Sequence, residues 1–446
     1  LSKKYNLPLI NPINESGIFN FDEPAFISSK INHLFFKDAD PYIIEELESR
    51  NLILYANLKG YEHDYPHCWR CKTPLIYYST KNWVIKVSKI KEKLLRVNEK
   101  INWHPPEIGK GRFYEWLKEG KDWNLSRTRM WGIPLPIWRC NLCGATEVIG
   151  SLKEIASHFK SKNKYIFMRH GEAISNTKNL LSSYPELFFN PLTPKGEKEV
   201  IKSANELVKR KIDLIVTSPL LRAKQTAEIL SNILNVPVIV DMRLREIDFG
   251  VLNGKSIKEY DKLFDSQYDQ YFKAPENGES LDDVRKRMIS AILELESTYE
   301  GKTILIISHQ DPLWALFGEM QGLSKKQTAE NEEFNLKPGE FKEIELLILP
   351  RDENNEINLH RPYIDKIKWN CKCGGVKERV EDLVDIWFDS GSAPFASYHY
   401  PFENKKEIDE GILFPVDFIV EGLDQTRGWF YTLLVVGYLI KKMEAY

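Results

Sequence analysis

The chain has 446 residues, of which 42% are hydrophobic and 12% aromatic, so it can bury a substantial core and is not a disordered segment. Its 62 Lys and Arg residues against 64 Asp and Glu residues give a net charge of −2, which excludes nucleic-acid binding through bulk charge. No apolar run approaches the roughly 20 residues that cross a bilayer. We therefore expect a cytoplasmic protein of about three domains with no membrane partner.

The N-terminal part, residues 1–150, is rich in Trp, Pro and Tyr and shows no regular alternation of strands and helices. Residues 39–53, ADPYIIEELESRNLI, are predicted to be helical. The chain begins without Met and without an apolar signal segment, which predicts an internal fragment. The stretch 81–103 is basic, and two interpretations of it stay open: it contacts nucleic-acid phosphates, or it is a solvated helix face. Its candidate phosphate contacts are Lys81, Lys86 and Lys89.

The six cysteines form three short pairs, which is typical of metal binding in a reducing compartment. Tetrahedral Zn²⁺ needs two such pairs. One pair precedes an internal α/β unit and another follows it, so these four cysteines come close in sequence when that unit is removed. We predict one structural zinc site at Cys140, Cys143, Cys371 and Cys373, with isolated buried thiols as the alternative. Cys68 and Cys71 are a further candidate metal pair, whose partners would lie outside this chain.

Residues 163–349 are predicted to form this α/β unit, because short β-branched runs alternate there with amphipathic stretches. The predicted strands are residues 165–171, 212–218, 236–240 and 303–309, and the predicted helices are 196–210, 220–234 and 280–299. The Trp-rich, Cys-paired character of the first part resumes after a charged loop at 350–362. One domain therefore interrupts another.

Polar residues follow the predicted strands in an informative order. In a doubly wound parallel sheet the carboxyl ends of the strands open on one edge, where ligands bind. Two histidines, two arginines and a carboxylic acid at that edge suit phosphoryl transfer, because imidazole attacks phosphorus, arginines hold phosphate oxygens and a carboxylic acid protonates the leaving oxygen.

The motifs RHGEAISN (169–176), SPLLRAKQTA (218–227), LREIDFG (244–250) and SHQDPLW (308–314) resemble the histidine phosphatase family, which includes phosphoglycerate mutases. The resemblance implies a three-layer α/β/α fold acting on a phosphomonoester. It further implies that His170 is the phosphorylated nucleophile and Glu246 the proton donor. The phosphate pocket would comprise Arg169, Arg222 and His309, with Asn176 assisting. Gln310 departs from the family, because many members carry Gly there, and the unit is short for a mutase, which favours phosphatase activity.

The flanks resemble the isoleucyl-tRNA synthetase family of class I synthetases. The resemblance rests on YPHCWRCKTPLIYY (65–78), WNLSRTRMWGIPLPIW (123–138), HRPYID (360–365), DIWFDSGSAPFASYHYPF (385–402) and FPVDFIVEGLDQTRGWFYTLL (414–434). It implies a Rossmann-like catalytic core that holds zinc. It also implies a monomer whose partners are isoleucine, ATP with Mg²⁺, and isoleucine tRNA.

In this resemblance, two tryptophans wall the aliphatic side chain, although ordinary core packing is an alternative for each. Glu421 would bind the isoleucyl-adenylate. The complete set of expected substrate-binding residues is Glu421, Gly422, Asp424, Gln425, Trp387 and Trp429.

The family's HIGH-type and KMSKS-type elements do not occur in this chain, so we expect about half of a synthetic site. Residues 1–64, with KKYNLPLINPI, resemble the C-terminal tail of the editing domain. The other expected segments are 65–155 (zinc knuckle and start of the catalytic region), 160–350 (inserted phosphatase-like domain) and 355–446 (second half of the knuckle and the incomplete catalytic core). Two alternatives stay open: a phosphatase whose flanks are a non-catalytic scaffold, and a synthetase whose insert is idle or regulatory.

Overall fold

The computed structural model describes residues 5–6, 11–21, 28–55, 63–78, 80–129, 131–331 and 334–446, in two compact units, 1–84 and 85–446. Within the first unit, helix α3 (Asp40–Ser49) lies inside the predicted helical stretch 39–53, and α2 is Ser28–Ile31. Its small core contains Phe19, Ile31, Phe36 and Ala39. Residues 3–4 and 7–10 of the KKYNLPLINPI stretch lie outside the described residues.

The α/β domain in the second unit contains a five-stranded sheet in the order β10-β6-β9-β7-β8. Four strands are parallel, and β10 pairs antiparallel with β6 at the edge. All four predicted strands are confirmed, whereas β10 was not predicted from the sequence. The strands are β6 (Lys164–Arg169), β7 (Leu214–Thr217), β8 (Val238–Val240), β9 (Thr303–Ser308) and β10 (Phe341–Ile344).

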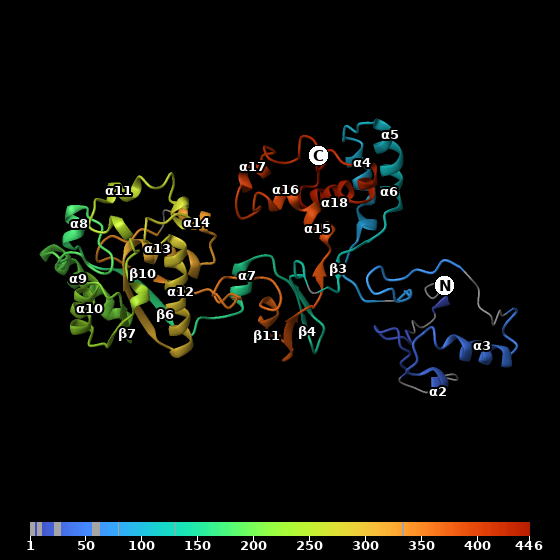
Figure 1. The fold of residues 1–446 in the computed structure, drawn as a ribbon, viewed down its shortest axis with the longest axis horizontal. Helices are drawn as coiled ribbons and strands as arrows, with labels where there is room; N and C mark the ends of the chain where they lie inside the picture. Colours follow the sequence, from blue (N-terminus) through green and yellow to red (C-terminus); the bar gives the residue numbers. More distant parts are fainter. Residues whose placement is uncertain are drawn as a thin grey trace. The chain divides into compact units, whose positions relative to one another are not determined.

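Helices cover both faces of this sheet, as Figure 1 shows for α9 and α10 on one side and α12 on the other. Successive residues of β6 face opposite layers: Ile166 and Met168 pack with α9 and α10, while Tyr165 and Phe167 pack with α12 and α13. The helices are α8 (Ile174–Lys178), α9 (Pro194–Leu207), α10 (Leu221–Leu234), α11 (Ile257–Asp261), α12 (Leu281–Thr298), α13 (Gln310–Met320) and α14 (Lys325–Ala329). The predicted three-layer α/β/α arrangement is confirmed.

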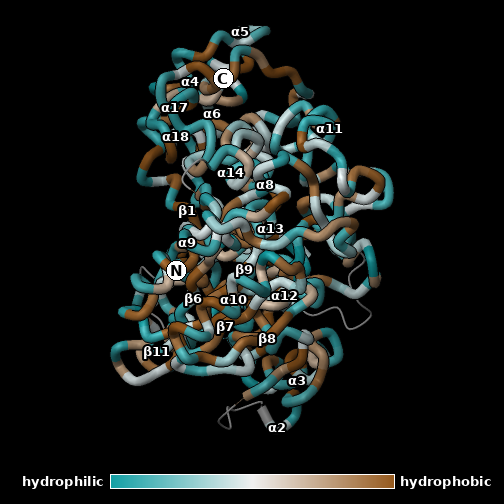
Figure 2. The backbone as a smooth tube through the Cα atoms, turned by 90° about the vertical axis from the view of Figure 1, so that its left-hand side faces the viewer, coloured by the Kyte–Doolittle hydropathy of each residue, from teal (hydrophilic) through white to brown (hydrophobic). Residues whose placement is uncertain are grey.

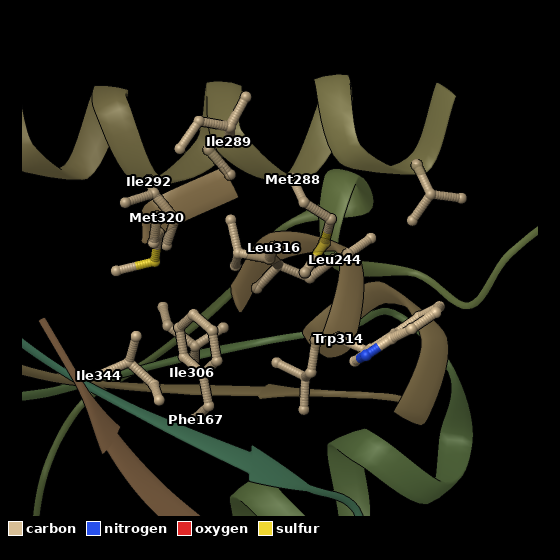
Figure 3. Close-up of a cluster of buried hydrophobic side chains, with 14 of the residues drawn as sticks. Phe167, Leu244, Met288, Ile289, Ile292, Ile306, Trp314, Leu316, Met320 and Ile344 are labelled. Carbon is tan, nitrogen blue, oxygen red and sulfur yellow. The ribbon is translucent and has the colours of Figure 1, made fainter. Parts of the chain in front are cut away.

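The α12 layer forms the larger core of the domain. In Figure 3, Met288 and Ile292 point from α12 toward Phe167 and Ile306 on the strands. Figure 2 accordingly shows hydrophobic residues concentrated along β6 and β7. Ser280 begins α12 with a capping box that it forms with Asp283, so the sequence signal for this helix start is a local hydrogen-bond pair.

The flanking segments form a mainly helical core of their own. Helices from before and after the insert pack together around buried residues of α18, including Leu434 and Val435. In the described part of these flanks, the strands next to the two ends of the insert pair antiparallel, whereas the parallel strands belong to the insert. The helices are α4 (Lys91–Asn98), α5 (Pro106–Ile108), α6 (Tyr114–Glu119), α7 (Leu152–Ser157), α15 (Ile386–Gly391), α16 (Ala393–Ala396), α17 (Lys405–Asp409) and α18 (Trp429–Lys441).

A four-stranded antiparallel sheet joins the two ends of the insert. Its order is β11-β12-β4-β5, so a hairpin from before the insert pairs with a hairpin from after it. These strands are β4 (Ile137–Cys140), β5 (Thr146–Val148), β11 (Trp369–Asn370) and β12 (Val376–Arg379). Two further strands, β3 (Ser126–Arg127) and β13 (Leu383–Val384), pair in the same manner. Among the described residues, no helix has the length and apolarity that crossing a membrane requires.

Candidate functional site

Three neighbouring parallel strands end at one edge of the α/β sheet, and each delivers a polar residue there. Arg169 ends β6 and His170 follows it, Ser218 follows β7, and His309 follows β9. A cavity of about 780 Å³ opens at this edge and is lined by Arg169, His170, Asn176, Arg222 and Glu246, among others. The structure therefore brings five of the six predicted phosphoryl-transfer residues to one cavity, and the sixth, His309, lies against His170.

His170 is buried, with 2% of its surface exposed. Its Nδ1 lies 2.7 Å from the Gly171 carbonyl oxygen, so Nδ1 carries the proton and Nε2 keeps its lone pair. Burial, together with the charges of Arg222 and Arg169, lowers the pKa of His170 well below its ordinary value. The imidazole is therefore neutral and has an unprotonated Nε2.

Arg222, at the start of α10, holds the other side of this imidazole. Its Nε donates to His170 Nε2 at 3.0 Å, and its Nη2 donates to the Ser182 carbonyl oxygen at 3.0 Å. Glu186 Oε1 lies 3.4 Å from Arg222 Nη1, and Glu186 Oε2 accepts a hydrogen bond from the Leu221 backbone at 3.0 Å. Glu186 was not predicted from the sequence, because a loop residue has no periodicity or motif that would mark it.

Arg169 is oriented by Gln310, the residue that departs from the family pattern. Arg169 Nη1 donates to Gln310 Oε1 at 3.3 Å and to the Leu336 carbonyl oxygen at 3.0 Å. Gln310 Nε2 in turn donates to Asn335 Oδ1 at 3.1 Å. Gln310 thus links Arg169 to the cavity wall.

His309 is fully buried, and its ring centroid lies 5.0 Å from that of His170. Its Nε2 lies 2.7 Å from Ser218 Oγ, and in the tautomer in which the serine hydroxyl donates, Nδ1 carries the proton. In the part of the chain that the structure describes, His309 Nδ1 and Arg169 Nε are buried without a hydrogen-bond partner. Two buried donors without acceptors next to His170 are what an anion-binding site would supply to phosphate oxygens.

Glu246 lies between the guanidinium group of Arg222 and the imidazole of His309. Its Oε2 is 3.7 Å from Arg222 Nη2 and 3.6 Å from His309 Nδ1. Burial, and then the neighbouring carboxylate of Asp311, raise the pKa of Glu246 to about 7. Near neutral pH this carboxyl group is therefore half protonated and can donate a proton. Asp311 was present in the SHQDPLW motif but had no role assigned from the sequence.

Asn176 lines the same cavity, and its side-chain oxygen binds the backbone at the start of α8. Asn176 Oδ1 accepts a hydrogen bond from the Ala173 backbone at 2.9 Å, at the start of α8. The bond fixes the amide plane, so the amide nitrogen keeps its two donor hydrogens for a ligand.

The four cysteines of the antiparallel sheet lie together. Cys140 Sγ is 3.5 Å from Cys373 Sγ, Cys143 Sγ is 3.8 Å from Cys371 Sγ, and all four sulfur atoms lie within 4.8 Å of one another. Zn–S bonds of about 2.3 Å in a tetrahedron put sulfur atoms about 3.8 Å apart, so the donor set fits Zn²⁺. The backbone N–H groups of Cys143 and Leu142 help to lower the pKa of Cys140 to about 6.

Cys68 and Cys71 lie in the first unit and are not part of that cluster. Cys71 Sγ is 3.1 Å from Thr73 Oγ1. Among the described residues, no third Cys, His, Asp or Glu joins these two into a group that could hold a metal ion. This pair alone does not complete a tetrahedral site.

Three of the predicted synthetase residues lie together around the N-terminus of α18. Gln425 Oε1 accepts from the Trp429 backbone at 2.9 Å, and Trp429 Nε1 donates to the Ser390 carbonyl oxygen at 3.0 Å. A Cβ atom at Gly428 would lie 3.2 Å from the Trp387 ring, which places that ring against the same turn. Gln425 Nε2 also donates to Asp424 Oδ2 at 3.0 Å.

The remaining predicted positions on this turn are open to solvent. Glu421, Gly422 and Asp424 are exposed, and 41% of Trp387 is exposed. Trp387 is thus available to a ligand, whereas Trp429 is half-buried and packs against the helical core. Lys81, Lys86 and Lys89 of the basic stretch are also exposed.

Asp385 is a positioning residue that was not predicted from the sequence. Its Oδ2 accepts from Trp123 Nε1 at 2.9 Å and from Arg127 Nη2 at 2.8 Å, and it caps the start of α15. The WNLSRTR segment from before the insert is thereby fastened to the DIWFDSG segment from after it. In the sequence, both segments carry motifs of the synthetase resemblance, but nothing there marks their contact.

Comparisons with known proteins match both parts of the chain. Residues 19–188 and 290–446 match the family model for class I tRNA synthetases (I, L, M and V), and residues 165–345 match the histidine phosphatase superfamily, branch 1. The chain is 27% identical over 439 residues to the isoleucine–tRNA ligase of Thermus thermophilus, covering 98% of this chain and 23% of that protein. It is 28% identical over 437 residues to the Clostridium acetobutylicum isoleucine–tRNA ligase, again covering 98% and 23%. The chain thus spans about a quarter of the length of these relatives.

Two solved structures are similar to part of this chain. "Mycobacterial hydrolase 1" matches with a TM-score of 0.37 at 23% identity, covering 41% of this chain and 90% of that chain. "Bacillus stearothermophilus YhfR" matches with a TM-score of 0.36 at 24% identity, covering 45% and 99%.

Proposed function

The chain belongs to the class I tRNA synthetases of the isoleucine, leucine, methionine and valine group and carries a histidine phosphatase domain, and from this membership we propose two activities. The flanks are part of an enzyme that activates isoleucine with ATP and transfers it to its tRNA. The insert hydrolyses a phosphomonoester through a phosphohistidine. We propose the four segments that the motifs predict, 1–64, 65–155, 160–350 and 355–446.

The proposed hydrolysis uses groups in the cavity. The ester's phosphoryl group binds Arg169, Arg222 and His309 Nδ1 and displaces the Arg222 contact from His170 Nε2. Nε2 then attacks phosphorus as the ester P–O bond breaks, and Glu246 gives its proton to the departing alcohol oxygen. In the second step Glu246 takes a proton from water, whose oxygen attacks phosphorus and releases His170 and inorganic phosphate.

One observation supports this proposal above the others: a neutral, buried His170 Nε2 lies beside two arginines and a buried His309 donor that has no acceptor among the described residues. A phosphate oxyanion bound beside His170 would supply acceptors for these buried donors. Their arrangement is that of a site shaped for an oxyanion.

Hydrolysis of p-nitrophenyl phosphate tests the proposal. We expect release of p-nitrophenol by this chain and its loss in His170→Ala. His360→Ala is the matched control, because His360 is exposed and does not line the cavity. Activity that survives in a folded His170→Ala protein would refute the assigned nucleophile, and a folded but inert parent would refute the hydrolysis.

The synthetase proposal concerns the exposed turn before α18. Glu421, Gly422, Asp424 and Gln425 present polar groups for the adenylate, and Trp387 presents an apolar wall for the aliphatic side chain. Isoleucine-dependent ATP–pyrophosphate exchange by the full-length protein that contains this chain tests the synthetase proposal. We expect Glu421→Ala to lose at least tenfold in exchange rate, while the exposed control Glu410→Ala keeps it. Equal rates in the two variants would remove Glu421 from the site.

For the metal, we propose that the thiolates of Cys140, Cys143, Cys371 and Cys373 hold one structural Zn²⁺. Bound zinc would supply cross-linking rather than catalysis, because four protein ligands leave no open position. It would join the hairpins at the two ends of the insert, which β4 and β12 already pair. Thiolate ligands fit the reducing conditions of the cytoplasm, where we place the protein.

A further inference from the structure

The cavity above His170 extends well beyond the phosphoryl site. Its volume of about 780 Å³ is large for a phosphoryl group alone and lies within the range of whole small-molecule sites. The additional wall includes Asp261 at the end of α11, Gln267 and Gln270, and Glu330 just after α14. This outer part leaves room for the alcohol portion of an ester.

The cationic side chains of the cavity are confined to the phosphoryl site. Among the described lining residues, Arg169 and Arg222 are the only Lys or Arg side chains, and both lie at His170. These two arginines can bind the phosphate oxygens, and they share their end of the cavity with the carboxyl groups of Glu246 and Asp311. The outer wall adds the carboxylates of Asp261 and Glu330, both exposed, and no described lining residue of this wall is Lys or Arg. A second anion on the ester would meet like charges there.

The uncharged groups of the wall favour hydroxyl-bearing partners. The amides of Gln267, Gln270 and Asn335 can each donate and accept a hydrogen bond, as hydroxyl groups also do. Tyr260 and Trp314 also line the cavity, although most of each side chain is buried in the domain core.

We propose that this site hydrolyses phosphomonoesters of uncharged, hydroxyl-rich alcohols, and discriminates against esters that carry a second anionic group near the phosphate. The inference rests on the proposed hydrolysis at His170 and adds the class of substrate. The outer carboxylates act on the choice of ester, whereas the bond that breaks is the same P–O bond for every ester.

Two small esters form a matched pair for the test. Glycerol 3-phosphate and 3-phosphoglycerate share the phosphate and the middle hydroxyl, and differ in a terminal CH₂OH against a carboxylate. We expect kcat/KM to be at least tenfold higher for glycerol 3-phosphate. The ratio of the two kcat/KM values should fall at least threefold in the double variant Asp261→Asn, Glu330→Gln. Because both values come from the same variant, a general loss of activity cancels in the ratio.

The control removes the same two charges outside the cavity. Glu259 and Asp265 are exposed and do not line it, so Glu259→Gln with Asp265→Asn should leave the ratio unchanged. If p-nitrophenyl phosphate is cleaved but 3-phosphoglycerate is hydrolysed as well as glycerol 3-phosphate, the selectivity is refuted and the hydrolysis stands. If the ratio survives in the cavity double variant, the carboxylates are not its cause. If no ester is cleaved, the hydrolysis is refuted and this inference with it.

Discussion

Replacing Asp311 by Asn tests whether Glu246 works as the proton donor. Burial and the Asp311 charge hold the pKa of Glu246 at about 7, so about half of the protein carries the proton at pH 7. If loss of the Asp311 charge lowers that pKa by about one unit, the protonated fraction at pH 7 falls from about one half to about one tenth. We therefore expect kcat/KM to fall about fivefold at pH 7 and to change little at pH 5.

The assay is a pH profile of kcat/KM with glycerol 3-phosphate, whose alkoxide leaving group needs a proton. The ratio of variant to parent at each pH cancels the ionisation of the substrate. p-Nitrophenyl phosphate is a second substrate, because its acidic phenol leaves without protonation and its profile should hardly move. Because the pKa of Glu246 is raised to about 7, activity that needs its proton is present below pH 7 and is lost as the pH rises through 7.

Asp265→Asn is the matched control, because it removes one exposed carboxylate that does not line the cavity. Circular dichroism shows whether Asp311→Asn folds. A uniform loss at all pH values, or equal losses with both substrates, would refute the role of the Asp311 charge. An unchanged profile in the folded variant would refute it as well.

Three other predictions concern the frame around the sites. Cys140→Ser with Cys371→Ser should remove about one zinc per chain from the purified protein, measured by plasma mass spectrometry, whereas Cys68→Ser with Cys71→Ser should not; equal zinc in both would contradict the Cys₄ site. Gly375→Ala should lower the free energy of unfolding by about 1–3 kcal/mol in urea titrations, because its Cβ would come within 2.7 Å of Cys140 Sγ, while Gly111→Ala, with no neighbour within 4 Å, serves as control. Asp385→Ala should lower the free energy of unfolding by about 2–4 kcal/mol in the same titrations, because Trp123 and Arg127 lose a buried acceptor. Glu381→Ala, at an exposed carboxylate, is the control. A loss in Asp385→Ala no larger than in this control would refute the role of Asp385 in holding the two segments together.

The strand-end residues could be predicted because parallel strands deliver their carboxyl ends to one edge. Arg169, His170 and His309 follow directly from that rule once the strands are identified. The cysteine cluster could also be predicted, because removing one self-contained domain brings its two halves together in sequence. Local patterns were sufficient where the geometry follows from regular structure.

Other parts depend on contacts that no local pattern encodes. Strand β10 reads FKEI, whose two charged residues hide the edge-strand signal, and it pairs with β6 only through the tertiary fold. Glu186 reaches Arg222 from a loop, and Asp311 acts through burial beside Glu246. The role of Gln310 in orienting Arg169 likewise needs the distance to Asn335.

The most direct test of the account is to trap the phosphoenzyme. Incubation with a ³²P-labelled phosphomonoester, a rapid denaturing quench and peptide mass spectrometry would locate any covalent phosphate. We predict an acid-labile, base-stable phosphoryl group on His170, present in the parent and in Glu246→Gln but absent in His170→Ala. Hydrolysis without covalent label, or label on another residue, would contradict the central claim that His170 is the nucleophile of a phosphatase domain within this synthetase chain.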